Sequence, residues 1–475
     1  MHITLDPRNI DGFIEGEVEN LQELLNLYNS CYTKNAIKNK YYEGNISLSD
    51  VNLGIALPEG LKGLEIGCAW GAKTVDVLAA RSMFDGFVGA NGGEIPELAE
   101  IVAGNNLIVE YSKAIRDELK FGCTFATLSA DSNLKCKIRF HSPQTAAAKW
   151  DGNKGRLSRG LAIIDTVPDN LEQTTWVPSI INYYTDTDIW VFTRNNNIWK
   201  AQRYPHKMGR PLMVALIWNA TSNKPFGRSR IKEPVRRLID GYVRTIANAT
   251  IGLEFATAPQ KYLLGVTDEQ YDAVINQKFR QYVGNIIAST TNPDTGEKPT
   301  FGQLQQGTIT PHVEMIRVLA TQFSAATGLP VSDTGVVNDA NPTSSDAIEA
   351  QTKTLVGMAE ELNKVNGSSL TIIAIMALAI ANNTSWDALS EDQKDIMPHF
   401  QNPAMPSVAA TTDAAIKIAS ARPTFANTDT FLEMIGFDQA EIRRIKAQEQ
   451  RERGMQLLEE MNQEPEEEET VIVEE

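Results

Sequence analysis

A short glycine-containing turn is the first stretch of the sequence that could do chemistry. The segment GLEIGCAWGAKTVDVL begins at Gly63 and leads from apolar residues into Gly67-Cys68-Ala69-Trp70-Gly71. Glycine lets a backbone approach a ligand closely, so a strand-end turn of this kind could hold a cofactor such as S-adenosylmethionine. The first hypothesis is therefore a methyltransferase.

The residues around this turn argue against that hypothesis. Its central position is Ala69, followed by the bulky Trp70, where close backbone approach needs glycine. Asp85 lies near the spacing expected of a ribose-binding carboxylate, but no apolar strand precedes it. Strand and helix also do not continue to alternate, as a parallel sheet would require. We therefore expect no cofactor here, and methyl transfer stays only as an alternative.

No other enzyme class is indicated by the sequence. The motifs G-x-S-x-G, G-x-x-x-x-G-K-[ST] and H-E-x-x-H are absent. His206 has no assignable nucleophile or carboxylate, so we expect a structural hydrogen bond there, while Asp186 and Asp188 are expected at a hairpin turn. The 4 cysteines and 5 histidines are scattered without metal-ligand spacing. The chain is predicted to be no enzyme and to bind no metal.

The elements that position these residues are helical at both ends and strand-rich in the middle. Residues 123–218 contain alternating runs such as KCKIRFHS, separated by Gly, Asn, Asp and Pro, which predicts an antiparallel sheet. Apolar residues at helical spacing precede it, with a break at AGNN. Further helices are predicted at 229–256, with Pro234 in the first turn, at 311–328, and from TSSDA into the apolar run LTIIAIMALAIA.

Composition limits the partners of the chain. Its 475 residues exceed one compact core, so two or more domains are expected. The net charge of -16 argues against wrapping nucleic acid, although a surface past which nucleic acid slides stays possible. The apolar run from Leu370 is shorter than the roughly 20 residues that span a bilayer, so we expect a buried helix and no membrane partner. The terminal EPEEEETVIVEE is expected to be disordered.

Three segments resemble portal proteins of tailed bacteriophages, in particular the long-tailed branch. The stretch PHKMGRPLMVALIWNATSNKPFGRSRI resembles the part that closes the family's sheet, and SAATGLPVSDTGVVNDANPTSSDAIEAQTKTL resembles the part before its long helix. The resemblance covers nearly the whole chain, with the segments in the family's order. The stretch WGAKTVDVLAARSMFDGF matches the family at Trp70, Val75, Asp76, Leu78, Arg81, Gly86 and Phe87.

The resemblance implies an α+β subunit of several parts. These would be an α/β wing with antiparallel strands, a two-helix stem, a small α/β clip, a long kinked helix and an α-helical C-terminal crown. The expected boundaries are 1–122 for the helical part of the wing, 123–226 for its sheet, 227–258 for the first stem helix, 259–310 for the clip, 311–327 for the second stem helix, 328–342 for the tunnel loop, 343–405 for the long helix and following segment, 406–463 for the crown and 464–475 for the tail.

The same resemblance implies three groups of functional residues. The tunnel loop would touch DNA through small, polar and apolar groups without Lys or Arg, although a plain exposed connection stays open. These residues are Val336, Val337, Asn338, Asp339, Ala340 and Asn341. Basic residues of the first stem helix would face the lumen or form inter-subunit ion pairs, namely Arg228, Arg230, Lys232, Arg236, Arg237 and Arg244. Clip residues facing the terminase or adaptor would be Asn292, Asp294, Thr295, Glu297 and Lys298.

The partners implied are those of a portal ring. The protein would assemble in the host cytoplasm and lie at one vertex of the virion, as a homo-oligomer usually of about twelve subunits. Double-stranded DNA would pass through it without sequence specificity. It would dock the terminase large subunit and then the head-tail adaptor, and would contact the major capsid and scaffolding proteins while nucleating procapsid assembly. A different ring-forming structural scaffold is the other alternative.

Overall fold

The structure is a computed structural model that describes residues 2–47, 65–89, 93, 95–169, 175–195, 198–257, 261–264, 296, 300–303, 308–336, 345–404, 408–437 and 439–462. The chain divides into two compact units, Met1–Pro403 and Ala404–Glu475. Helices and strands both contribute to the first unit, which confirms the predicted α+β class.

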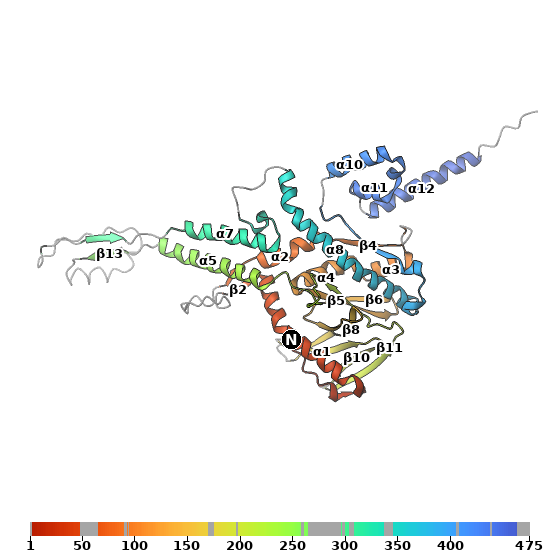
Figure 1. Ribbon diagram of the computed structural model, residues 1–475, viewed down its shortest axis with the longest axis horizontal. Coiled ribbons are helices and arrows are strands. Elements are labelled where there is room, and N and C mark those ends of the chain that lie inside the picture. Colours follow the sequence, from red (N-terminus) through yellow and green to blue (C-terminus); the bar gives the residue numbers. More distant parts are fainter. Residues whose placement is uncertain are drawn as a thin grey trace, which may run out of the picture. The chain divides into compact units, whose positions relative to one another are not determined.

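A six-stranded sheet forms one part of the first unit (Figure 1). Helix α1 (Glu15–Glu43) packs on it, and its Leu21 and Tyr28 share a buried cluster with Leu161 and Phe192 of the sheet. Neighbouring strands are antiparallel except the parallel pair β1 and β11. The strand order is β1 (Ile10–Asp11), β11 (Ile198–Pro205), β10 (Asp188–Asn195), β9 (Trp176–Tyr184), β8 (Arg156–Pro168) and β7 (Ala146–Asp151).

A second, three-stranded sheet has the order β12 (Met213–Ile217), β5 (Cys123–Asp131) and β6 (Lys135–His141). The antiparallel pairing predicted for 123–218 is therefore confirmed, but the strands form two sheets instead of one. The chain changes sheet after β6, where the carbonyl of Ser142 accepts the N–H groups of Thr145 and Ala146. This turn redirects the backbone away from its β5 partner.

Helices α4 (Leu107–Phe121) and α8 (Ser345–Ala381) pack on the three-stranded sheet. The predicted break at AGNN separates α4 from α3 (Pro96–Gly104), with Asn106 at a positive φ of 50°. Ala350–Ala381 of α8 is long and apolar enough to cross a membrane by length and composition alone, although 56% of its most apolar window is buried. The buried residues of its apolar run belong to the main core, as predicted.

The glycine turn of the opening motif connects a short antiparallel pair to α2 (Trp70–Ala79). The pair is β2 (Asn45–Ser47) with β3 (Glu65–Gly67), and its strands are antiparallel. Gly71 lies against α1, where an added Cβ would be 1.9 Å from the Tyr41 carbonyl oxygen. The close contact between α2 and α1 therefore accounts for this glycine. A second pair, β4 (Phe84–Gly89) with β15 (Ile396–Phe400), follows.

Two long helices, α5 (Glu233–Thr257) and α7 (Thr310–Thr327), pack side by side and project from the sheets (Figure 1). Pro234 lies in the first turn of α5, as predicted, where its missing N–H leaves no helical bond unmade. Between them in sequence lies the antiparallel pair β13 (Lys261–Leu264) and β14 (Thr300–Gln303). The remaining short elements of this unit are η1 (Pro7–Asn9), η4 (Val331–Thr334), η5 (Trp386–Ala388) and α9 (Glu391–Lys394).

The second unit is helical in its described residues, as predicted. Asp429 at the start of α11 forms an ion pair with Lys446 of α12, and the rings of Phe425 and Phe431 lie 5.9 Å apart. The predicted acidic tail lies outside the described residues. The elements are α10 (Val408–Ala421), η6 (Pro423–Asn427), α11 (Asp429–Met434) and α12 (Gln439–Asn462).

Candidate functional site at the junction of the long helices

The segment expected to become the tunnel loop starts from a firmly anchored point. Helix α7 ends at Gly328, whose φ of 72° reverses the chain into η4. The indole Nε1 of Trp70 on α2 donates to the Thr334 carbonyl at 3.1 Å. The Trp70 ring lies 4.6 Å from that of Tyr242 on α5 and 4.8 Å from that of Phe323 on α7. One buried indole therefore joins the three helices to the loop segment.

Val336 is the last described residue before α8, and it packs half-buried against the core. The other tunnel-loop candidates, Val337, Asn338, Asp339, Ala340 and Asn341, lie outside the described residues. Their assignment as a DNA-contacting loop stays a prediction.

Arg230 is buried at the same junction, with 6% of its surface exposed. Its Nε donates to the Thr74 carbonyl at 2.6 Å, and its Nη2 donates to the Thr327 carbonyl, at the end of α7, at 2.7 Å. Nη1 has only the thioether of Met358 on α8, at 3.5 Å. Burial lowers the pKa of Arg230 to about 10, so the guanidinium stays charged at neutral pH. The positive charge suits the negative end of the α7 dipole.

The side chain of Arg230 is buried in its own chain, unlike an exposed channel residue, and its expected role as a lumen-facing or inter-subunit group stays a prediction. Its side chain contacts α2, the end of α7 and α8 of its own chain and lines a cavity between them. Sequence position alone suggested exposure, because Arg is usually exposed and its neighbours are basic. The backbone carbonyls that hold the guanidinium come from segments about a hundred or more residues away, which spacing does not reveal.

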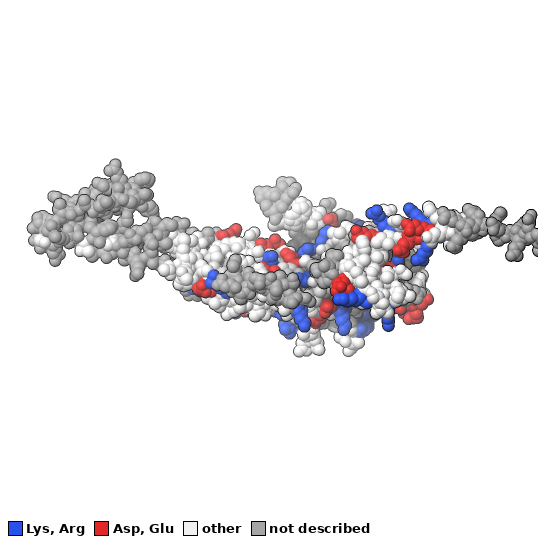
Figure 2. Space-filling model, turned by 90° about the horizontal axis from the view of Figure 1, so that it is seen from above, with Lys and Arg blue, Asp and Glu red and all other residues white. Residues whose placement is uncertain are grey.

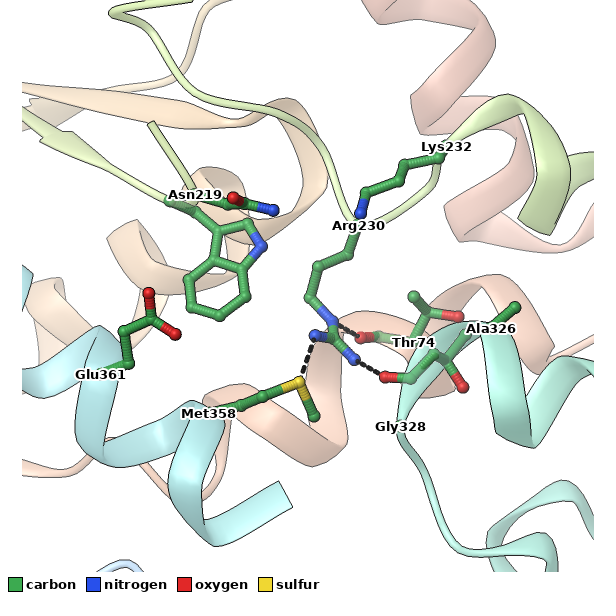
Figure 3. A pocket seen from close by; sticks show the side chains of 10 residues that line it. Thr74, Asn219, Arg230, Lys232, Ala326, Gly328, Met358 and Glu361 are labelled. Atoms are coloured by element: carbon green, nitrogen blue, oxygen red, sulfur yellow. Dashed lines mark hydrogen bonds between the residues drawn. The ribbon is translucent and has the colours of Figure 1, made fainter. Parts of the chain in front are cut away.

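A cavity of about 250 Å³ opens beside Arg230 (Figure 3). Figure 3 shows Lys232 and Arg230 on one side and Glu361 of α8 on the other. The cavity is lined by Thr74, Trp218, Asn219, Arg230, Lys232, Ala326, Thr327, Gly328, Met358 and Glu361.

The other basic candidates lie along the start of α5 in different surroundings. Arg228 and Lys232 are exposed, and Lys232 lines the cavity. Arg237 is exposed and forms an ion pair with Glu233 at 2.6 Å, while the half-buried Arg236 lies 5.7 Å from the Tyr41 ring. Arg244, about two turns further along α5, is half-buried. The structure thus brings together Arg228, Arg230 and Lys232 but does not join all six residues into one surface.

The clip candidates fall in the part of the chain that is not described. Asn292, Asp294, Thr295, Glu297 and Lys298 all lie outside the described residues. The β13–β14 register, which pairs Leu264 with Thr300, brackets this segment. Its role in docking stays a prediction.

The described surface carries both signs of charge. Figure 2 shows Lys and Arg intermixed with Asp and Glu over the described part of that face. Intermixed charges give little of the phosphate neutralisation that holds nucleic acid tightly.

The residues weighed as catalytic have structural roles. Asp188 follows the turn between β9 and β10, and its carboxylate accepts Nε and Nη2 of Arg203 at 2.7 and 3.0 Å. This bond lowers the pKa of Asp188. The backbone N–H of His206 donates to the Thr187 carbonyl, and burial lowers the pKa of the His206 imidazole. Both observations agree with the hairpin and turn that were predicted.

Sequence reasoning missed a buried polar network between α4 and α8. Nδ2 of Asn366 donates to Oε2 of Glu118 at 2.7 Å and to the Tyr111 hydroxyl at 3.3 Å. The signal was present in the sequence, because Tyr111, Ile115 and Glu118 share one face of α4 at helical spacing. A carboxyl group on an otherwise apolar helix face indicates that the carboxyl group is buried.

Comparison with known proteins gave one family and several solved structures. The family described as "Phage portal protein, SPP1 Gp6-like" matches residues 13–455. No curated protein matched the chain. Among solved structures, a chain from the "Neck of native GTA particle computed with C12 symmetry" is 13% identical with a TM-score of 0.44, and the match covers 78% of this chain and 89% of that chain. A chain from the "Virion of native gene transfer agent (GTA) particle" is 12% identical with a TM-score of 0.44, covering 74% and 86%.

Proposed function

Because this chain belongs to the SPP1 Gp6-like family of phage portal proteins, we propose that it forms a ring at one capsid vertex and that double-stranded DNA is packaged and later ejected through the channel. The observation that carries the proposal is the pair of long packed helices, α5 and α7, followed by the segment that Trp70 anchors. The two helices would form part of the channel wall, and the segment anchored by Trp70 would be the fixed base of the tunnel loop.

The charge of the subunit supports passage of DNA without adhesion. A net charge of -16 per chain, repeated around a ring, produces a field that repels phosphate. The tunnel-loop candidates Val336–Asn341 include Asp339 and no Lys or Arg, so contact with the duplex releases few counterions. We propose that this loop touches DNA weakly and without reading its sequence.

The contacts with other proteins are proposed from the order of the segments along the chain. The segment between α5 and α7 would dock the terminase large subunit during packaging and the head-tail adaptor afterwards. The ring, of about twelve copies, would contact the major capsid and scaffolding proteins and nucleate procapsid assembly in the host cytoplasm. The helical second unit would form the crown. The candidates for lumen-facing or inter-subunit groups remain Arg228, Lys232, Arg236, Arg237 and Arg244.

Microscopy of the purified protein tests the ring directly. We expect negative-stain class averages, viewed down the particle axis, to show about a dozen subunits around a central hole. The comparison sample is the same protein co-expressed with its scaffolding protein, because some rings need a scaffold to form. A monomer or dimer in both samples would contradict the proposal.

A further inference from the structure

Three cations lie together at the α5 start without a carboxylate partner. Among the described residues, no ion pair within 4.0 Å joins Arg228, Arg230 or Lys232 to an acidic side chain. Two other cations form close ion pairs, Arg237 with Glu233 and Arg203 with Asp188. Burial, and then the charges of Arg230 and Arg228, lower the pKa of Lys232, which agrees with their proximity.

The guanidinium of Arg230 also has N–H groups that are not bonded to an oxygen acceptor. Of its five N–H groups, two are used on carbonyl oxygens, at 2.6 and 2.7 Å, and a third meets only a sulfur atom at 3.5 Å. Sulfur is a weak acceptor, and a buried charged donor without a good acceptor is destabilising. The cavity of about 250 Å³ lies directly beside these donors (Figure 3).

We propose that this cavity receives a carboxylate side chain from a second copy of this chain. The inference rests on the proposed ring, and it assigns Arg230 and Lys232 as the receiving groups, with Arg228 adding positive potential. A planar carboxylate suits a guanidinium, which offers parallel N–H groups.

The surroundings favour a carboxylate over a phosphate group. Glu361 lines the far side of the cavity, and its negative charge repels a doubly charged phosphate more than a single carboxylate. Carboxylates are also abundant on any neighbouring copy, since each chain carries 60 acidic residues against 44 basic ones. Asn219, held at a positive φ of 51°, adds an exposed amide at the lining.

Zero-length crosslinking tests the proposal on the unmodified full chain. Rings are assembled from a mixture of unlabelled and ¹⁵N-labelled chains, and a carbodiimide then joins amines to carboxylates in direct contact. Mass spectrometry of the digest should contain a peptide pair in which Lys232 of one isotope is linked to an Asp or Glu of the other. Links from Lys232 only to its own chain, including Glu361, would overturn the proposal, as would no link at all.

Charge-reversed variants supply a second measurement. K232E rings should dissociate at lower salt than wild-type rings, whereas K149E rings should behave as wild type. Lys149 is a suitable control because it lies on β7 and already pairs with Glu23 of α1. Equal salt dependence of K232E and wild type would count against the proposal. If the wild-type chain itself forms no ring, it is the proposed function that fails.

Inorganic phosphate distinguishes a free anion from a neighbouring subunit. The unassembled chain is treated with acetic anhydride with and without phosphate, and acetylation of Lys232 is followed by mass spectrometry. Acetylation that is the same in both samples, with Lys232 protected only in rings, supports the inter-subunit contact. Protection by phosphate in the unassembled chain would identify a free oxyanion site and contradict the proposal.

Discussion

At the scale of single residues, Glu118 is a buried carboxyl that lacks a cationic partner among the described residues. Its Oε1 and the Oδ1 of Asn366 both lack a donor, although the two side chains already share the Nδ2 to Oε2 bond. Burial raises the pKa of Glu118 to about 8. The titratable groups facing it are the Tyr111 phenol and the Cys123 thiol, whose pKa values burial also raises. A proton on Glu118 supplies the donor that the two oxygens lack.

The substitution E118Q should change how stability depends on pH. The pKa of Glu118 is raised in the folded chain from 4.5 to about 8, so between these values the folded state holds one more proton than the unfolded state. The free energy of unfolding of the wild type therefore falls as pH rises, by at most about 1.4 kcal/mol per pH unit from this group. E118Q removes this contribution, so its stability relative to wild type should rise between pH 5 and 8.

Urea denaturation of both proteins across this pH range measures the difference. E110Q is the matched control, because Glu110 lies on the same helix but is exposed and pairs with Lys113. A difference between E118Q and wild type that stays constant with pH would show that Glu118 holds no extra proton.

At the scale of elements, the position of α2 depends on close contact with α1. Gly71 lies where any side chain would meet the Tyr41 backbone, and Gly44 approaches the Cys68 carbonyl in the same way, at 2.6 Å for an added Cβ. α2 in turn presents Trp70 to the segment after α7. The spacing of α1 and α2 therefore determines where the loop segment is anchored.

The substitution G71A should destabilise the protein, whereas G67A should be nearly neutral. An alanine Cβ at position 71 would lie 1.9 Å from a backbone oxygen, and nothing lies within 4 Å of one at position 67. Overpacking of this kind typically costs about 1–3 kcal/mol, and backbone cannot move aside as a side chain can. Thermal unfolding of the two variants tests this. An equal loss of stability in both variants would mean that the turn containing Gly67 and Gly71, and not the contact between α1 and α2, requires glycine.

At the scale of the whole molecule, an acidic subunit with intermixed surface charges suits a channel wall better than a nucleic-acid clamp. Arg228, Arg230 and Lys232 lie together at the start of α5, where we propose that a neighbouring chain binds. Under these proposals, ring formation depends on residues at the start of α5, whereas DNA passage depends on the tunnel loop. They can be separated by mutation.

Replacing Val336–Asn341 with a Gly-Ser linker should leave ring assembly intact and impair DNA filling. The anchor formed by Trp70 and Thr334 lies outside the replaced segment, so the fold around it should persist. End-on microscopy checks the ring, and nuclease-protected DNA per particle checks packaging. Normal filling by the variant would refute the tunnel-loop assignment.

The sequence by itself determined the local elements, because hydrophobic periodicity, capping residues and turn residues act over a few positions. It predicted the antiparallel region at 123–218, the helices α5, α7 and α8, and the family. Only the tertiary structure decided which side chains meet across long separations. The division of the strands into two sheets, the burial of Arg230, the anchoring of the loop by Trp70 and the Glu118–Asn366 pair all depend on contacts between distant segments. No spacing rule encodes such contacts, since they follow from how whole elements pack.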